Sequence, residues 1–119
     1  MAVSPSFRTF IVDQLSRAVE HVRARSMFGG VGIYGGDLFF ALIADDTLYF
    51  KVDESNRPDF EDLGMTPFQP YGEGGEVMQY YQVPAEVLED SEALRPWVEK
   101  AMAVAGRKKH KRARRRGRA

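Results

Sequence analysis

The chain has 119 residues, a length that suits one domain, and 44% of them are hydrophobic, which is enough to fill a core. It contains no cysteine, so disulfide frameworks, thiolate nucleophiles and cysteine zinc sites are excluded, and a cytoplasmic location is expected. Its 17 Lys and Arg balance its 17 Asp and Glu, and as a total this neutrality argues against a polyanionic partner.

The first predicted element is an amphipathic helix from Ser4 to about Val22. Ser4 is a favourable N-cap because its hydroxyl accepts a hydrogen bond from the first turn, and Pro5 suits that turn because its missing N–H costs nothing there. The helical pattern comes from apolar residues that recur three or four positions apart: Phe7, Phe10, Ile11, Leu15, Ala18, Val19 and Val22.

Three short strands in a meander are predicted between residues 27 and 52. A Gly-Gly-Asp triplet at positions 35–37 indicates a hairpin turn before the apolar run 38–44. Residues 47–52 then alternate between apolar and polar or aromatic side chains, which is typical of a strand with one buried side.

A short acidic helix is predicted from Glu54 to Gly64. Either Ser55 or Asn56 serves as its N-cap, because both side chains accept hydrogen bonds from free amides of a first turn. Gly64 is expected to end the helix in the left-handed conformation. Such a short element covers little of the core.

A further strand pair is predicted over residues 67–71 and 77–83, joined by the loop 72–76. Prolines in the first of these strands place it at an edge of the sheet, because proline has no N–H to donate to a neighbouring strand. Pro84 ends the second strand.

The last predicted helix carries apolar residues at helical spacing and ends at Gly106. Either Ser91 caps it and Pro96 removes one early backbone hydrogen bond, or the regular helix begins nearer Arg95.

These elements predict an α+β fold with a five-stranded antiparallel sheet. Their order is helix, three strands, helix, two strands, helix. Both long helices carry an apolar stripe, so we expect them to pack on the same face of the sheet and leave the other face open.

The charges are unevenly distributed along the chain. Residues 1–106 contain all 17 acidic residues and eight bases, which gives this body a net charge of −9, while residues 107–119 carry the other nine bases. We expect the domain to end at Gly106 and the tail to be disordered in isolation, because its like charges repel and nothing in it can be buried. The nine bases are Arg107, Lys108, Lys109, Lys111, Arg112, Arg114, Arg115, Arg116 and Arg118.

Two interpretations of the tail follow from its charge. It can bind nucleic-acid phosphates without sequence preference, because flexible bases displace condensed counterions and need no shaped site. Alternatively, it stays solvated or folds back on the acidic body, an attraction that salt screens over about 8 Å. We favour the first interpretation, since nine bases in thirteen residues far exceed what solubility requires.

Several short motifs occur in a fixed order through the body. Arg25, Met27, Phe28, Gly29 and Gly30 form an Arg-x-Met-Phe-Gly-Gly pattern. With these motifs the chain resembles the N-terminal domain of the TfoX/Sxy family. The later motifs of the same resemblance are Tyr49-Phe50-Lys51, Asp53, Gly64, Pro67-Phe68, Tyr80-Tyr81, Val83-Pro84 and Trp97.

The resemblance implies a fold like that of secretion chaperones and a role without enzymatic activity. Full-length members of the family regulate natural competence, working with the cyclic-AMP receptor protein at promoters. We therefore expect a stand-alone copy of a regulatory or adaptor domain, whose body contacts a protein. The alternative is a protein-binding or homodimerising module with no role in nucleic-acid binding.

Gly30, Gly32 and Gly35 match the GxGxxG pattern of dinucleotide-binding turns. A Rossmann turn follows a strand and opens a helix, whereas here a helix precedes and a strand follows. A kinase-type glycine hairpin with Lys51 as its strand lysine needs a second lobe that this length does not provide. We therefore interpret the glycines structurally, as residues that permit turns, a bulge and close packing.

No catalytic constellation is evident. His21 and His110 have no plausible Ser or Cys partner, and the acidic residues lack the spacing of a calcium loop. We expect no enzymatic activity, no cofactor and no metal. The chain starts without a signal-peptide pattern and has no apolar run of about 18 residues, so a membrane partner is not expected either.

The open face of the sheet is the remaining candidate site. Strand alternation places Tyr49 and Lys51 there together, and either Tyr80 or Tyr81 must join them. Rings and a cation on one surface can stack nucleobases or hold a peptide. The alternative, which we rank higher from sequence, is a homodimer interface or cross-strand packing.

Overall fold

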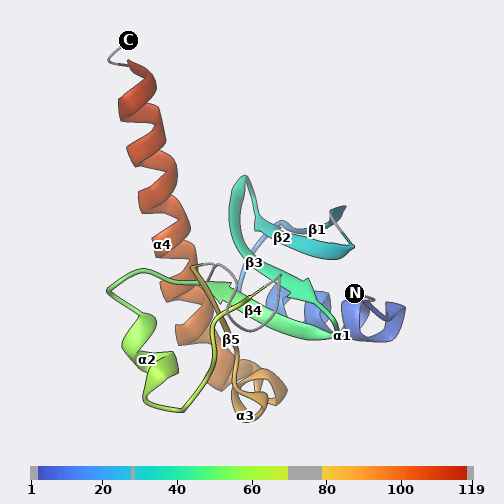
Figure 1. Cartoon of the computed structure of the whole chain (residues 1–119). Coiled ribbons are helices and arrows are strands. Elements are labelled where there is room, and N and C mark those ends of the chain that lie inside the picture. Colours follow the sequence, from blue (N-terminus) through green and yellow to red (C-terminus); the bar gives the residue numbers. More distant parts are fainter. Residues whose placement is uncertain (1–2, 28, 70–78, 118–119) are drawn as a thin grey trace.

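The computed structural model describes residues 3–27, 29–69 and 79–117, and for residues 111–117 it describes the backbone alone. The chain folds into one sheet with helices before and after it (Figure 1). In chain order the elements are α1 (Pro5–Ser16), β1 (Val22–Met27), β2 (Gly30–Gly35), β3 (Leu38–Ala44), β4 (Thr47–Lys51), α2 (Arg57–Glu61), β5 (Tyr80–Gln82), α3 (Ala85–Glu89) and α4 (Ser91–Gly117).

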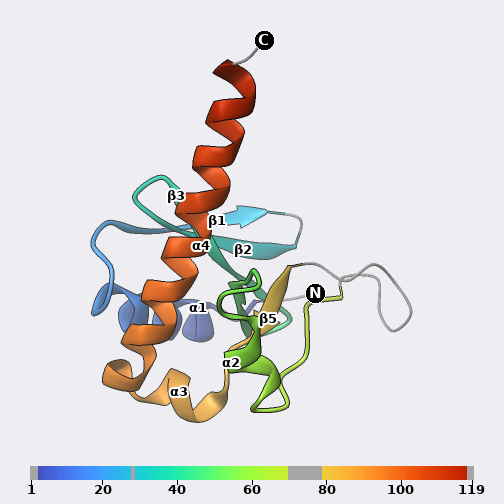
Figure 2. The ribbon, with the colours of Figure 1, turned by 90° about the vertical axis from the view of Figure 1, so that its left-hand side faces the viewer.

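The sheet has five antiparallel strands in the order β1-β2-β3-β4-β5, so every strand pairs with its neighbour in sequence. This confirms the predicted α+β class and the five-stranded antiparallel sheet. The long helix α4 packs against β3 and β4, and α1 packs against β1 and α4, so both long helices cover one face (Figure 2). No described helix covers the other face.

The core lies between that covered face and the helices. Alternation along the strands directs one set of apolar side chains toward α1 and α4, and these side chains are almost completely buried. Burying each is worth roughly 1.5–3 kcal/mol relative to exposing it. The core includes Ile11 and Leu15 of α1, Ile33, Phe40, Ile43, Leu48 and Phe50 of the sheet, and Leu94, Val98 and Ala101 of α4.

The glycines of the GxGxxG pattern lie inside a strand. Gly30, Gly32 and Gly35 all belong to β2, and no helix follows them. A Cβ atom on Gly30 would stand 2.6 Å from the carbonyl oxygen of Ile43, so the approach of β3 excludes any side chain there. The structure therefore supports the structural interpretation of these glycines over the nucleotide-binding one.

The first helix is shorter than predicted, and a strand takes its expected last turns. α1 ends at Ser16, and residues 22–27 form β1, so four strands instead of three precede α2. Val22 and Ala24 face the core side while Arg23 is exposed, a two-residue alternation that the helical spacing of the preceding apolar residues obscured.

The second predicted strand pair is present only in part. Its second strand is β5, and the first makes an isolated bridge between Pro67 and Tyr81. Two backbone bonds flank this bridge, from Phe68 N to the Tyr80 oxygen at 2.8 Å and from Gln82 N to the Thr66 oxygen at 3.0 Å. The expected loop 72–76 lies outside the described residues. The five-residue helix α3 was not predicted.

The short helix α2 is also shorter than predicted, and its capping differs. Asn56 occupies the N-cap position but makes no capping bond. Its buried amide instead donates to the Lys51 carbonyl and accepts from the Asp53 N–H, which ties β4 to the start of α2. Gly64 has φ of +73°, so the predicted left-handed stop is confirmed.

α4 differs most from expectation. Its cap is Asp90 and not Ser91, because the Asp90 carboxylate accepts from the N–H groups of Glu92 and Ala93. The helix begins at Ser91 and continues through Gly106, its predicted end, to Gly117. Lys, Arg and Ala are strong helix formers, and positive charge at a helix C-terminus complements the helix dipole.

Replacing Gly106 with Ala tests the continuity of α4. A Cβ there would lie 4.0 Å from Leu38 Cδ1, an ordinary contact, so the variant should gain about 0.5–1 kcal/mol of stability from helix propensity. Gly30→Ala, which introduces the same methyl group, should instead lose about 1–3 kcal/mol because of its backbone clash. Denaturant unfolding measures both values, and a destabilised Gly106→Ala would contradict an unbroken helix.

Candidate functional site

The face without helices carries a mixed set of aromatic, basic and apolar side chains. The register of the strands places Tyr80 on this side, opposite Lys51, and turns Tyr81 toward the core side, where its ring packs 6.0 Å from Phe60. We call this surface the open face. Its residues are Arg23, Arg25, Met27, Tyr34, Phe39, Leu42, Tyr49, Lys51, Tyr80 and Gln82.

The rings of the open face pack against one another. Tyr34 stacks on Phe39 with ring centroids 5.0 Å apart, and Phe39 lies 6.0 Å from Tyr80. Tyr49 packs 4.9 Å from the ring of Phe68, which precedes the described edge strand β5. Partial burial raises the pKa of the Tyr49 hydroxyl, with the nearby Asp45 as the second cause. These side chains therefore form a supported aromatic surface.

Two cations lie over these rings. The guanidinium of Arg23 is 5.4 Å from the centroid of Tyr34, and the ammonium of Lys51 is 5.1 Å from Phe39 and 5.6 Å from Tyr80. Ring faces attract cations because of their negative quadrupole, so the rings hold these positive groups in place. The predicted grouping of Tyr49, Lys51 and Tyr80 is thus confirmed, while Tyr81 does not belong to it.

The open face is positive in an otherwise acidic body. Among its described positions three are basic, Arg23, Arg25 and Lys51, and none is acidic. The body as a whole carries −9. Charge is therefore segregated on the body as well as between the body and the C-terminal end of α4.

Sequence reasoning did not place several residues at this surface: Arg23, Arg25, Met27, Tyr34, Phe39 and Phe68. Met27 lies over Gly32, where an added Cβ would approach the Met27 methyl to 2.6 Å. For Arg23 the alternation of Arg and small apolar residues along 22–25 was a usable signal. For Phe39 and Phe68 the sequence offered no signal that separates them from core residues.

The Arg-x-Met-Phe-Gly-Gly motif spans the end of β1 and the turn into β2. Arg25 and Met27 belong to the open face, while Gly29, with φ of +79°, and Gly30 shape the turn. Phe28 lies outside the described residues. Two of the five motif residues are therefore surface groups and two are required by the backbone.

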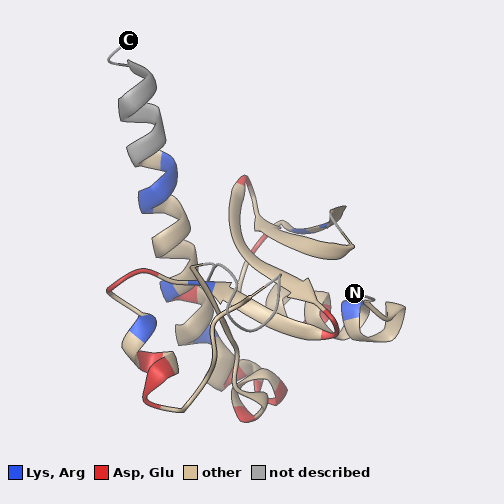
Figure 3. Ribbon diagram, viewed as in Figure 1, with Lys and Arg blue, Asp and Glu red and all other residues tan. Residues whose placement is uncertain are grey.

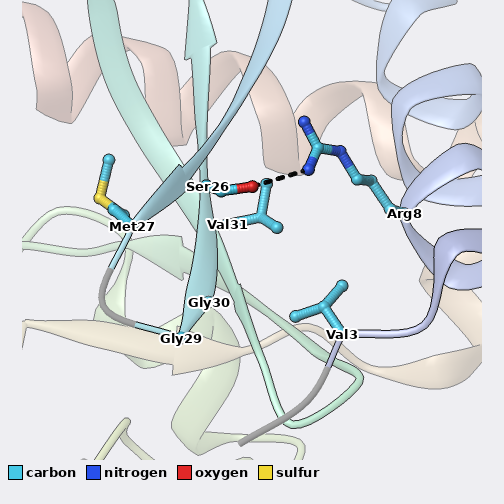
Figure 4. Close-up of a pocket in the computed structure, with 7 residues that line it drawn as sticks. All are labelled: Val3, Arg8, Ser26, Met27, Gly29, Gly30 and Val31. Carbon is cyan, nitrogen blue, oxygen red and sulfur yellow. Dashed lines mark hydrogen bonds between the residues drawn. The ribbon is translucent and has the colours of Figure 1, made fainter.

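A pocket of about 430 Å³ lies on the other side of this turn, between β1, β2 and the start of α1 (Figure 4). Its cation is Arg8, which donates to the Ser26 hydroxyl at 3.0 Å and to the Ala24 carbonyl at 3.1 Å. These bonds fasten α1 to β1, so Arg8 acts as a structural link. Val3 and Val31 supply apolar lining.

The second candidate site is the end of α4, where residues 107–117 carry eight of the nine C-terminal bases. We call this segment the basic arm. It extends beyond the sheet, whereas the acidic α2 and the acidic start of α4 lie at the opposite end of the molecule (Figures 1 and 3). Eight of the nine predicted nucleic-acid residues therefore belong to one projecting helix, while Arg118 lies outside the described residues.

The first turn of the basic arm is tied to the body. Arg107 donates to Asp53 Oδ2 from Nη2 at 2.9 Å and from Nε at 3.2 Å, and it also reaches the Ser55 hydroxyl at 2.8 Å. Lys109 pairs with Asp37 in the turn between β2 and β3. Both pairs are largely exposed to solvent.

These contacts change the acidity of both carboxyl groups. Partial burial raises the pKa of Asp53, but hydrogen bonds from Ser55 and Arg107 and the charge of Arg107 outweigh it and lower that pKa to about 2. The hydrogen bond from Lys109 and its charge lower the pKa of Asp37. Both acids thus stay ionised and paired with the arm across the physiological range.

The remaining candidates are not brought together by the fold. His21 is exposed and adopts φ of +58° before β1, and His110 is exposed on the basic arm. No group of three His, Asp or Glu side chains within the described residues can hold a metal ion. None of the helices within residues 3–27, 29–69 and 79–117 is long and apolar enough to cross a membrane.

Comparison with known proteins identifies the family of this chain. A curated relative is the DNA transformation protein TfoX1 of Aliivibrio fischeri (strain ATCC 700601 / ES114), which is 42% identical over 45 residues. That match covers 38% of this chain and 22% of the relative, so the chain matches about a fifth of that protein. The family model of the TfoX N-terminal domain matches residues 13–105, far more than half of the sequence. The chain therefore belongs to the TfoX N-terminal domain family.

Proposed function

We propose that this chain is a non-enzymatic regulatory domain that associates with nucleic acid through the basic arm, without sequence preference. The observation that carries the proposal is the separation of charge, with −9 on residues 1–106 and nine bases after them. The name of the relative, a DNA transformation protein, is consistent with a regulatory role connected with DNA uptake.

A helical basic arm limits how many phosphates one duplex can meet. Successive residues of an α-helix are about 100° apart around its axis, so a helix rich in bases cannot turn all of them toward one duplex. We therefore expect about half of the nine bases to contribute to the binding of one duplex. We expect log affinity to fall with log salt concentration at a slope of about −4, since each neutralised phosphate contributes about −0.9.

Contact with phosphates competes with contact with the body. Arg107 and Lys109 are engaged by Asp53 and Asp37, and a polyanion must replace these carboxylates to use both bases. Exposed ion pairs contribute little to stability because water and salt screen them, so the many phosphates of a nucleic acid can replace both carboxylates. The acidic body thereby moderates the affinity of the arm without preventing binding.

A second candidate function, docking of a protein, is favoured by a pocket of about 320 Å³ between α2 and α4. Leu63 is 57% exposed at its rim, and Pro96 and the half-buried Trp97 line it. Exposed leucine beside tryptophan is typical of protein contact surfaces. Asp62 and the ion pair of Asp59 with Lys100, whose Nζ lies 2.7 Å from Asp59 Oδ2, supply polar groups beside this apolar lining.

The arm proposal predicts a large effect of neutralising its outer half. Replacing six bases with Gln in the full chain should weaken binding to a mixed-sequence duplex at least tenfold and should flatten the salt slope by about 2–3. Fluorescence anisotropy between about 50 and about 200 mM salt measures both. The six are Lys111, Arg112, Arg114, Arg115, Arg116 and Arg118.

The matched control changes the five arginines of that set to lysine. It keeps the charge, so the affinity for the duplex should stay within about twofold if phosphate neutralisation dominates. Unchanged duplex affinity after the Gln replacements would contradict the proposal. A large loss of duplex affinity in the lysine control would show that binding depends on guanidinium geometry and not on charge alone.

We predict how much stability the Asp53–Arg107 pair contributes and how that contribution depends on pH. Asp53→Asn should lower stability at neutral pH by about 0.5–1 kcal/mol and raise duplex affinity about twofold, because Arg107 is released. A carboxyl whose pKa is depressed on folding stabilises the protein above its ordinary pKa of about 4. In the unaltered chain this contribution should therefore disappear as the pH falls from about 4 through about 2.

Urea unfolding at several pH values measures this effect, and Asp13→Asn serves as the control because Asp13 is an exposed acid on α1. The control removes the same charge and should leave both stability and its acid dependence nearly unchanged. If the two variants raised duplex affinity equally, net charge alone would explain the gain and the specific pairing would be refuted.

A further inference from the structure

We propose that the open face binds single-stranded nucleic acid, with phosphates on its cations and bases against its rings. The inference deepens the proposed function and rests on it in one respect, that this chain engages nucleic acid. It assigns a class of ligand to the open face, a surface that is separate from the basic arm.

The charge of the open face selects an anionic ligand. Arg23 and Arg25 stand two residues apart on β1, which places them roughly 7 Å from one another along the strand, and Lys51 lies on β4. None of the described positions on this face is acidic. Salt screens the net charge of −9 on the body within about 8 Å, so the three bases at the described positions of this face give it a local positive charge.

The rings add surfaces on which bases can stack. Tyr34 and Phe39 form a half-buried stacked pair with ring centroids 5.0 Å apart, and the buried Tyr80 supports Phe39 from 6.0 Å. Tyr49 with Phe68 adds a second half-buried pair. Because these side chains are already packed against neighbours, binding costs them little conformational entropy. Bases stack on aromatic rings and on guanidinium planes, so the Arg23 group above Tyr34 extends the same surface.

The open face is continuous with the basic arm. Lys109 reaches Asp37 in the turn between β2 and β3, and Arg23 donates to the carbonyl of Gly36 in the same turn at 3.2 Å. The two views of the ribbon agree that α4 passes this turn (Figures 1 and 2). A flexible polyanion held by the arm therefore meets the Arg23 end of the open face next.

Two other occupants fit the surface less well. A second copy docked face to face would oppose Arg23, Arg25 and Lys51 with the same three cations. A duplex keeps its bases stacked inside, so it offers the open face phosphates alone. A single strand exposes both phosphates and bases, and it is the one of these three that uses the cations and the rings together.

The test compares an oligothymidylate of about 20 nucleotides with a mixed-sequence duplex of the same length, using the full chain. The variant is Arg23→Gln with Arg25→Gln. The matched control is Arg17→Gln with Arg95→Gln, which removes the same charge from two exposed positions outside the open face. Anisotropy titrations of the unaltered chain, the variant and the control at one salt concentration give the affinity of each protein for both ligands, and therefore its single-strand preference.

The open-face variant should lose about tenfold in affinity for the oligothymidylate and about twofold for the duplex, while the control should lose about twofold on both. Tyr34→Leu, which keeps an apolar contact with Phe39, should lose about fivefold on the single strand alone. Its unfolding curve shows whether the fold is retained, and Tyr49→Leu provides an independent ring variant should Tyr34→Leu unfold.

The inference would be overturned if the open-face variant lost affinity equally for the single strand and the duplex. It would also be overturned if the unaltered chain bound the single strand no more tightly than the duplex. A dimer in sedimentation that Arg23→Gln with Arg25→Gln dissociates would replace it with self-association. The arm variant with six Gln separates the two proposals. If it leaves duplex affinity intact while the single-strand preference persists, the arm proposal fails and the open-face inference stands. If it loses duplex affinity while the open-face variant loses no single-strand preference, the arm proposal stands and the open-face inference fails.

Discussion

The packing of α4 across β3 and β4 is the contact on which the other features of this molecule depend. Leu94, Val98, Ala101 and Ala105 of the helix close the core against Phe40, Ile43 and Phe50 of the sheet. Only one face of the sheet is covered in this way. Because the buried half of α4 sets its direction, the same contact also determines where the basic arm points and which turn of the sheet it passes.

The two faces of the sheet consequently serve different purposes. The covered face is filled by aliphatic and phenylalanine side chains, as a core requires. The open face retains rings that pack against one another and against cations, and no described helix lies above them. A sheet covered on one side can build a binding surface from alternate residues of the same strands that build its core, which is economical in a chain of this length.

Much of this arrangement follows from local sequence patterns. The α+β class and four of the five strands were predicted. So was the placement of Tyr49 and Lys51 on one face, because the two-residue period of β4 is unbroken. Phe39 was not assigned to the open face. Phe40 and Ala41 are both buried beside an irregularity in the β2–β3 register, and such a bulge cannot be recognised within a continuous apolar run. The choice between Tyr80 and Tyr81 required the register of β5 against β4, a long-range property that no local pattern contains.

The continuity of α4 through Gly106 has a consequence for how the arm behaves. An isolated helix must first form a costly nucleus, but residues 107–117 extend a helix whose preceding turns are already held by the core. Their order is therefore governed by propagation alone, one residue at a time. The helical part of such a segment lengthens and shortens gradually as ionic strength or a bound polyanion changes the repulsion among its charges. The distance that the arm spans is therefore graded, and the arm has no folding transition of its own.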